Sequence, residues 1–133
     1  MSFEEILRKK DISIRDLQQF QEEYDKKFVD EKFTGFEKVR HTSLHLAKLL
    51  GKLAGYCEKM EEGVSMGSEQ LENEVIPDLI VYALWLAREF NINPDEAYLK
   101  RMINNIERIY SHKSSQNERE EFKRLLDERV NIK

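Results

Sequence analysis

The sequence predicts an all-α protein, and three observations favour this fold class. The 133 residues include only five glycines and two prolines, so few positions favour turns. Charged and apolar residues recur three and four positions apart along most of the chain, which is the spacing of a helix face. No stretch carries a convincing strand pattern. We therefore expect an antiparallel helical bundle of about five helices, folded as a single domain over residues 1–133.

The first long helix is expected over residues 14–28. Ser13 stands three positions before Asp16, as in a capping box at the start of a helix. One apolar stripe then follows the helix, made of Ile14, Leu17, Phe20, Tyr24 and Phe28. Thr34 and Gly35 are expected to break the chain before the next helix.

The second helix is expected over residues 36–62, with Gly63 as its stop signal. Its expected apolar face carries Val39, Leu46, Leu50, Leu53, Cys57 and Met60. Because Cys57 is the only cysteine, an internal disulfide is excluded. We expect this thiol to be a small core residue of a cytoplasmic protein.

The third helix is expected to follow a loop over residues 64–68 and to contain the apolar run from Val75 to Ala87. Pro77 lies in its first turn or kinks it. Asp78 is the only charged residue of this run, whose apolar side chains would cover every face of a helix. A buried carboxylate without a partner costs several kcal/mol. Asp78 therefore calls for a metal ion, a Lys or Arg, or a bound proton.

Two more helices are expected towards the C-terminus. Asn93, Pro94 and the acids that follow them predict the start of a helix that ends near Tyr110. After a polar break, a charge-rich helix over residues 116–130 has a narrow apolar side. This side consists of Phe122, Leu125 and Leu126. We expect the last helix to be peripheral or to lie at a subunit interface.

The composition excludes several classes of partner. The 22 Lys and Arg are interspersed with 26 Asp and Glu, which argues against a nucleic-acid-binding arm or a membrane-binding basic patch. The longest apolar run, Leu79–Ala87, has about half the length of a membrane span. We expect a cytoplasmic protein that binds no nucleic acid and no membrane, with small ligands or proteins as partners.

Acidic side chains offer candidate metal ligands. Glu74 and Asp78 lie one turn apart on the third helix and could reach one ion, for which Mg²⁺ or Mn²⁺ is the suitable class. Glu58 and Glu61 add two carboxylates near the end of the second helix. The alternative for Glu74 is a structural role in the first turn, and for Glu58 and Glu61 a charged, solvated helix end.

Basic side chains offer candidate phosphate contacts. One stripe of the second helix, opposite Leu50, carries His41, His45, Lys48 and Lys52. It is compatible with a phosphate-contacting surface, a two-histidine metal site or a solvated face. The fourth helix presents a further set on one face, Arg101, Asn105 and Arg108. That set could hold a triphosphate or be solvated.

Four segments share their order and spacing with a known family. They are Ser-Ile-Arg-Asp-Leu-Gln-Gln-Phe at 13–20, Leu-Gly-Lys-Leu-Ala at 50–54, Asp-Leu-Ile-Val-Tyr at 78–82, and Arg101-Met102-x-x-Asn105-x-x-Arg108. Together they resemble the MazG-like branch of the all-α nucleoside triphosphate pyrophosphohydrolases, over a core of residues 14–110. The resemblance implies a homodimer or homotetramer that holds Mg²⁺ with a Glu-x-x-Glu and a Glu-x-x-Asp pair. It implies cleavage of a nucleoside triphosphate to monophosphate and pyrophosphate.

This chain departs from the family pattern at the metal ligands. The family's first carboxylate pair aligns with Leu49 and Lys52, and Val75 stands three positions before Asp78. One hypothesis is a Mg²⁺- or Mn²⁺-dependent pyrophosphohydrolase with a rearranged site. Its metal ligands would be Glu74, Asp78, Glu58 and Glu61, and its substrate contacts His45, Lys48, Lys52, Arg101, Asn105 and Arg108.

The other hypothesis is a non-catalytic, oligomeric nucleotide-binding or interaction protein. In it Lys52 would pair with Asp78 and supply the positive charge that a metal otherwise brings. Neither hypothesis assigns a catalytic residue.

Overall fold

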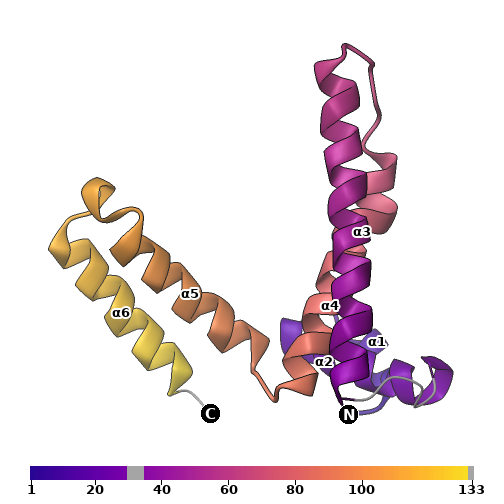
Figure 1. Ribbon diagram of the computed structural model, residues 1–133. Helices are drawn as coiled ribbons and strands as arrows, with labels where there is room; N and C mark the ends of the chain where they lie inside the picture. Colours follow the sequence, from indigo (N-terminus) through magenta and orange to yellow (C-terminus); the bar gives the residue numbers. More distant parts are fainter. Residues whose placement is uncertain (30–34, 132–133) are drawn as a thin grey trace. The chain divides into compact units, whose positions relative to one another are not determined.

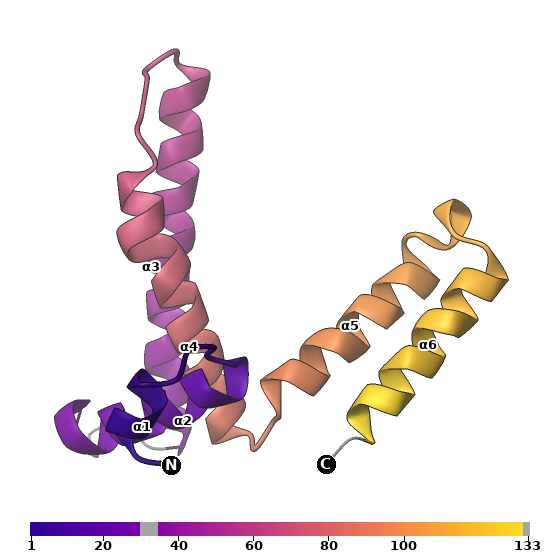
Figure 2. The same ribbon diagram turned by 180° about the vertical axis from the view of Figure 1, so that it is seen from behind.

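The computed structural model describes residues 1–29 and 35–131. Every secondary-structure element in these two ranges is a helix (Figure 1, and from behind in Figure 2). The α-helices are α1 (Phe3–Leu7), α2 (Ile14–Tyr24), α3 (Gly35–Glu61), α4 (Ile76–Glu89), α5 (Pro94–Arg108) and α6 (Gln116–Val130). Two π-helices, η1 (Asp25–Val29) and η2 (Leu71–Val75), and one 3₁₀ turn, η3 (Ser111–Lys113), complete the elements. The predicted all-α class is confirmed.

The chain separates into two compact units, Met1–Asn91 and Ile92–Lys133. In the first unit α3 and α4 lie antiparallel, η2 packs on both of them, and α2 packs on α4 (Figure 1). In the second unit α5 and α6 form an antiparallel helical hairpin. The sequence predicts one domain with a core over residues 14–110, and the division after Asn91 falls inside that range.

The capping box predicted for the first long helix is confirmed at α2. The Asp16 backbone N–H donates to Ser13 Oγ at 3.1 Å, and Ser13 N–H donates to Asp16 Oδ2 at 2.9 Å. Lys9 Nζ donates to Asp16 Oδ1 at 2.6 Å. These bonds, that from Lys9 first, lower the pKa of Asp16 to about 2. The α-helix ends at Tyr24, and the predicted continuation to Phe28 is the π-helix η1.

Glycines in the left-handed region flank α3. Gly35 has φ +55° at its first residue, and Gly63 has φ +80° just beyond its end. Val64 N–H donates to the carbonyl of Lys59 at 2.9 Å, and Gly63 N–H to that of Met60 at 3.1 Å. This is a C-terminal cap that requires a positive φ, so Gly63 is confirmed as the stop signal. The predicted break at Thr34 lies outside the described residues.

The predicted apolar face of α3 is mostly exposed, although Val39 and Leu46 are half-buried. Leu50 is 61% exposed, and Met60 and the Cys57 thiol are also exposed, whereas Leu49 is 4% exposed. The inward face carries Leu49 together with Lys38 and Thr42. Cys57 is therefore not a core residue.

The expectation that α4 is buried on every side is also wrong. Leu84, Trp85 and Ala87 are buried, but Ile76 and Ile80 are about half exposed. Pro77 lies in the first turn of α4, as one predicted alternative has it, but η2 runs directly into this turn. Because proline has no N–H, it leaves one carbonyl of η2 without an intrahelical donor. Within the described residues, no helix combines the length and the apolar character needed to cross a membrane.

The second unit follows the sequence prediction closely at α6. This helix spans Gln116–Val130, and Ser115 and Glu118 form a capping box at its start. Its apolar side packs on α5, and together the two helices line a groove of about 200 Å³. The lining residues are Leu99, Met102, Ile103, Phe122, Leu125, Leu126 and Arg129. An ion pair between Lys123 and Glu107 also links the two helices.

Candidate functional site

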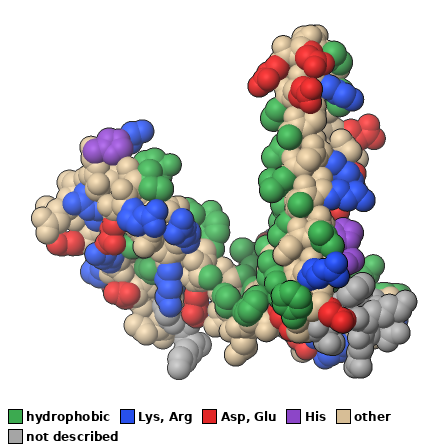
Figure 3. Space-filling view, viewed as in Figure 1, with side chains coloured by type: hydrophobic (Ala, Val, Ile, Leu, Met, Phe, Trp, Pro, Cys, Tyr) green, Lys and Arg blue, Asp and Glu red, His purple; other side chains and the backbone are tan. Residues whose placement is uncertain are grey.

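The histidine and lysine stripe of α3 faces α4. The His45 ring stacks on Tyr82 with 5.3 Å between centroids, and the His41 ring lies 6.5 Å from that of Trp85. The two histidine rings are 4.3 Å apart. Figure 3 shows basic and histidine side chains along one side of α3 and hydrophobic side chains along the other. His41, His45 and Lys52 are half-buried and Lys48 is exposed, so the stripe is partly packed and partly solvated.

Lys52 forms an ion pair with Glu74 of η2. The sequence hypothesis paired Lys52 with Asp78 instead, and no ion pair joins those two residues in the described part of the chain. Glu74 precedes Asp78 by four positions, but it lies on a π-helix, whose turn is wider than that of an α-helix. The carboxylate that reaches Lys52 is therefore one turn earlier than the expected one.

Asp78 lies half-buried in the first turn of α4. The pKa of Tyr82, one turn further on, is raised by burial first and by the negative charge of Asp78 second. Within the described residues Asp78 has no ion-pair partner. Because the Asp78 carboxylate is partly solvated, its charge does not require the cation that full burial would have required.

The predicted metal ligands do not meet. Glu58 and Glu61 are exposed near the C-terminal end of α3, and by helical geometry they share the face of Leu50 rather than that of Lys52. Glu74 and Asp78 lie on successive turns, but Glu74 is held by Lys52. In the ranges 1–29 and 35–131, no three His, Cys, Asp or Glu side chains come together as a metal-binding group.

The predicted substrate contacts divide between the two units. His45, Lys48 and Lys52 belong to α3, where Lys48 is exposed. The remaining predicted contacts lie on α5 of the second unit, with Arg101 and Arg108 exposed. The Asn105 side-chain oxygen is buried there and accepts no hydrogen bond from a described residue.

Sequence reasoning missed the group around Trp85. Lys38 is a buried lysine whose Nζ lies 3.8 Å from Glu89 Oε2 and 5.2 Å above the Trp85 ring. Tyr82 meets Trp85 edge-on at 5.8 Å. The spacing of Tyr82, Trp85 and Glu89 along one face of the third helix was the available signal. The indole N–H of Trp85 is buried and donates no hydrogen bond within the described residues.

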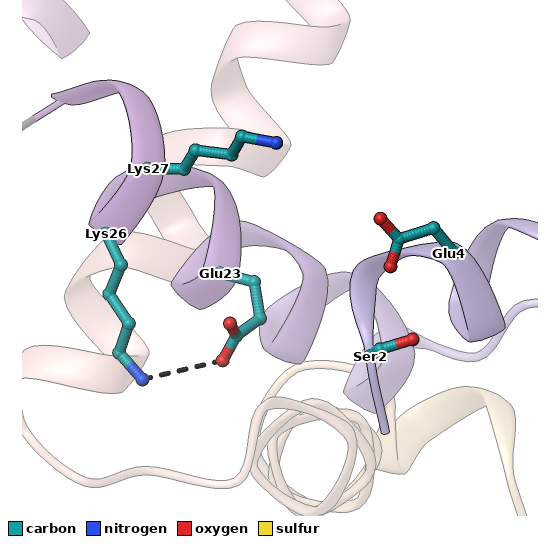
Figure 4. A pocket seen from close by; sticks show the side chains of 5 residues that line it. All are labelled: Ser2, Glu4, Glu23, Lys26 and Lys27. Carbon is teal, nitrogen blue, oxygen red and sulfur yellow. Dashed lines mark hydrogen bonds and ion pairs between the residues drawn. The ribbon is translucent and has the colours of Figure 1, made fainter.

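A separate surface groove of about 380 Å³ lies between the start of α1 and the end of α2 (Figure 4). Its lining residues are Ser2, Glu4, Glu23, Lys26 and Lys27. Lys26 points towards Glu23, and their charged atoms are 3.5 Å apart. The lining has two acids and two lysines, so its formal charges balance and give no preference for a ligand of either sign.

No family model, curated protein or solved structure matches this chain. The resemblance to the MazG-like pyrophosphohydrolases stays a prediction. What the described residues offer is a helix face with four basic side chains from α3, namely His41, His45, Lys48 and Lys52, and two carboxylates from η2 and α4. The lysines of such a face can bind a phosphate group. Of the two carboxylates, Glu74 pairs with Lys52.

Lowering the pH from about 7 to about 5 is expected to destabilise the first unit through His41. Burial, and secondly the charge of His45, lower the pKa of His41 from 6.5. The unfolded chain therefore binds a proton at a higher pH than the folded chain does, and stability falls as the pH drops below 6.5 towards the lowered pKa. Melting temperatures measured across this range should show a step that His41→Gln flattens. His112→Gln, at an exposed residue of the second unit, should preserve it. An undiminished step in His41→Gln would contradict the assignment.

Proposed function

We propose that this chain is a non-catalytic, oligomeric nucleotide-binding protein of the cytoplasm, related to the MazG-like pyrophosphohydrolases. The ion pair between Lys52 and Glu74 carries the proposal. A lysine stands where the resemblance calls for a metal-binding carboxylate, and it neutralises one of the carboxylates that could replace it. The fixed positive charge takes the place of the metal ion.

The ligand class follows from the α3 stripe. Lys48 is exposed beside the half-buried His45 and Lys52, so its ammonium group is available to a phosphate from solvent. A triphosphate carries several negative charges, and a lysine contacts it as a point charge without needing a metal. The α5 residues Arg101, Asn105 and Arg108 stay a prediction as further phosphate contacts.

Replacing Lys52 with glutamate should make the stability of the folded chain depend on Mg²⁺. Lys52→Glu would place three carboxylates at positions 52, 74 and 78, which is the donor chemistry that Mg²⁺ prefers. We expect the melting temperature of the natural chain to be unchanged by millimolar Mg²⁺. The variant should be less stable without metal, because like charges meet, and should be stabilised by Mg²⁺ through binding to the folded state.

Lys48→Glu is the matched control, because it makes the same charge change at an exposed site one turn earlier. It should give no Mg²⁺ stabilisation but should weaken binding of a nucleoside triphosphate, measured by calorimetry in the presence of a chelator. Equal Mg²⁺ responses in both variants would argue against a site at Lys52. If the natural chain binds no nucleoside triphosphate, the proposal that it is a nucleotide-binding protein is wrong.

A second candidate, a Mg²⁺-dependent pyrophosphohydrolase, is favoured by one observation. Asp78 is a half-buried carboxylate without an ion-pair partner among the described residues, so it is available to a cation. With Glu74 released from Lys52, the two acids would hold Mg²⁺, which would activate a water and bind the triphosphate.

Pyrophosphate release separates the two candidates. We expect none from standard or damaged nucleoside triphosphates with Mg²⁺ or Mn²⁺. Release that disappears in Asp78→Asn would establish the hydrolase instead, whereas release that persists in this variant would point to a contaminating enzyme. A Mg²⁺-induced rise in the melting temperature of the natural chain would also favour the hydrolase.

A further inference from the structure

α3 has a long apolar face that the described residues of its own unit leave uncovered. Phe36, Leu44 and Leu50 are 79%, 60% and 61% exposed. Ala47, Gly51, Ala54 and Cys57 are exposed too, and all seven residues lie within about 70° of the line through Ala47 and Ala54. The helix has 27 residues and is about 40 Å long. Hydrophobic side chains follow this edge of α3 in Figure 3.

The exposed face belongs to a unit with a small core. The large apolar side chains buried in the described residues are Ile6, Leu49, Val75, Leu84 and Trp85. These are few large buried side chains for a chain of 133 residues, which is long enough to bury a sizeable core. A continuous exposed apolar strip of this length marks an interaction site.

The face is complementary to itself when two copies run in opposite directions. If the helices cross between Leu50 and Gly51, Leu50 lies opposite Gly51 of the second copy, and Ala47 lies opposite Ala54. Leu44 then lies opposite Cys57. Large side chains meet small ones, which lets two helices pack closely. A Cβ at Gly51 would meet no atom within 4 Å among the described residues, so packing within the described part of its own unit does not explain the glycine.

The charges at the two ends of the face select the same orientation. Arg40 lies near its start and Glu61 near its end, and neither side chain has a hydrogen bond or ion pair with a described residue. In the antiparallel arrangement Arg40 of each copy lies opposite Glu61 of the other. A parallel arrangement would place like charges side by side, which is unfavourable.

We propose that a second copy of this chain docks on this face, with α3 against α3, antiparallel, about a two-fold axis between Leu50 and Gly51. The same patch then serves both copies, as in an isologous dimer. Glu58 and Glu61, candidate metal ligands in the sequence, become residues of this interface. The proposal is independent of the nucleotide site, because Lys52 and His45 lie on the other side of α3.

Disulfide trapping tests the register. In a Cys57→Ser background, Ala47→Cys and Ala54→Cys chains with different tags are co-expressed and oxidised. The mixture should give a heterodimeric disulfide, and each variant alone should give little, because equal positions lie about 10 Å apart along an antiparallel pair. Disulfides formed by Ala47→Cys alone as readily as by the mixture would establish a parallel pair and overturn the proposal. So would a chain that sediments as a monomer at micromolar concentration.

Charge exchange tests the orientation without cysteines. Arg40→Glu and Glu61→Arg should each weaken the dimer by about tenfold or more, measured by sedimentation, since two like-charge contacts form per dimer. The double variant should recover the original affinity. Lys59→Glu, a charge reversal of the same kind away from the face, should leave the dimer unchanged. If the double variant lost as much binding free energy as the two single variants together, Arg40 would not pair with Glu61 and the proposed orientation would be wrong.

Discussion

Replacing Trp85 with alanine is expected to lower the free energy of unfolding of the first unit by about 3–5 kcal/mol. The side chain is buried between α3 and α4, where it contacts the rings of His41 and Tyr82. The Lys38 ammonium lies 5.2 Å above it. Alanine would leave a cavity and would strip a buried cation of its aromatic neighbour. Urea unfolding followed by circular dichroism measures the loss.

Two variants separate this packing from other effects. Trp85→Phe keeps an aromatic ring and removes an indole N–H that donates no hydrogen bond within the described residues, so it should cost less than half as much as alanine. Ile80→Ala, on an exposed part of the same helix, should cost about 0.5 kcal/mol or less. If Trp85→Ala and Ile80→Ala were equally mild, Trp85 would not be a core residue.

Helix ends were predictable because local chemistry determines them. The Ser13–Asp16 pair caps α2, Gly63 ends α3, and α6 has the predicted range. Each signal satisfies backbone groups within a few residues of itself. The short helix α1 escaped notice although Ser2 and Glu5 form a capping box, because it has too few residues for a periodic apolar pattern.

The buried face of α3 was not predictable from apolar periodicity, because the face that packs on α4 and η2 includes basic side chains. The inward face carries Lys38, which pairs with Glu89 of α4, and Lys52, which pairs with Glu74 of η2. His45 lies on the same side and stacks on Tyr82. Long basic side chains can cover apolar surface in this way. A pattern that counts only apolar residues therefore selects the Leu50 face, which in this chain is exposed.

The sequence predicted which residues of α3 share a face at the candidate site, but it did not predict which residues form the ion pair. His41, His45, Lys48 and Lys52 share a face, as their spacing indicates. Lys52 pairs with Glu74 of η2 and not with Asp78 of α4, the partner expected if the two helices packed as in the MazG-like family. Spacing along one helix does not determine which side chains of a neighbouring helix lie opposite it.

Replacing Glu89 with glutamine is expected to lower the free energy of unfolding by about 1–3 kcal/mol. Lys38 is a buried lysine, and the Glu89 carboxylate, 3.8 Å from its Nζ, faces it from α4. Glutamine preserves the shape of the side chain and removes its charge, so the ammonium loses its counter-charge. The loss stays below that of a fully buried pair because the Glu89 side chain retains some exposure to solvent.

Lys38→Met shows whether the charge is the cause. Added to Glu89→Gln, it should restore most of the lost stability, because no uncompensated charge is then buried and the apolar stem still packs on Trp85. The coupling between the two changes in a double-mutant cycle measures the pair itself. Glu121→Gln, which removes an exposed partner of Arg124 on α6, should leave the unfolding midpoint of the first unit unchanged. A Lys38→Met change that further destabilised Glu89→Gln would show that the lysine contributes by packing or other contacts, and the ion pair would then not be what stabilises this end of α3.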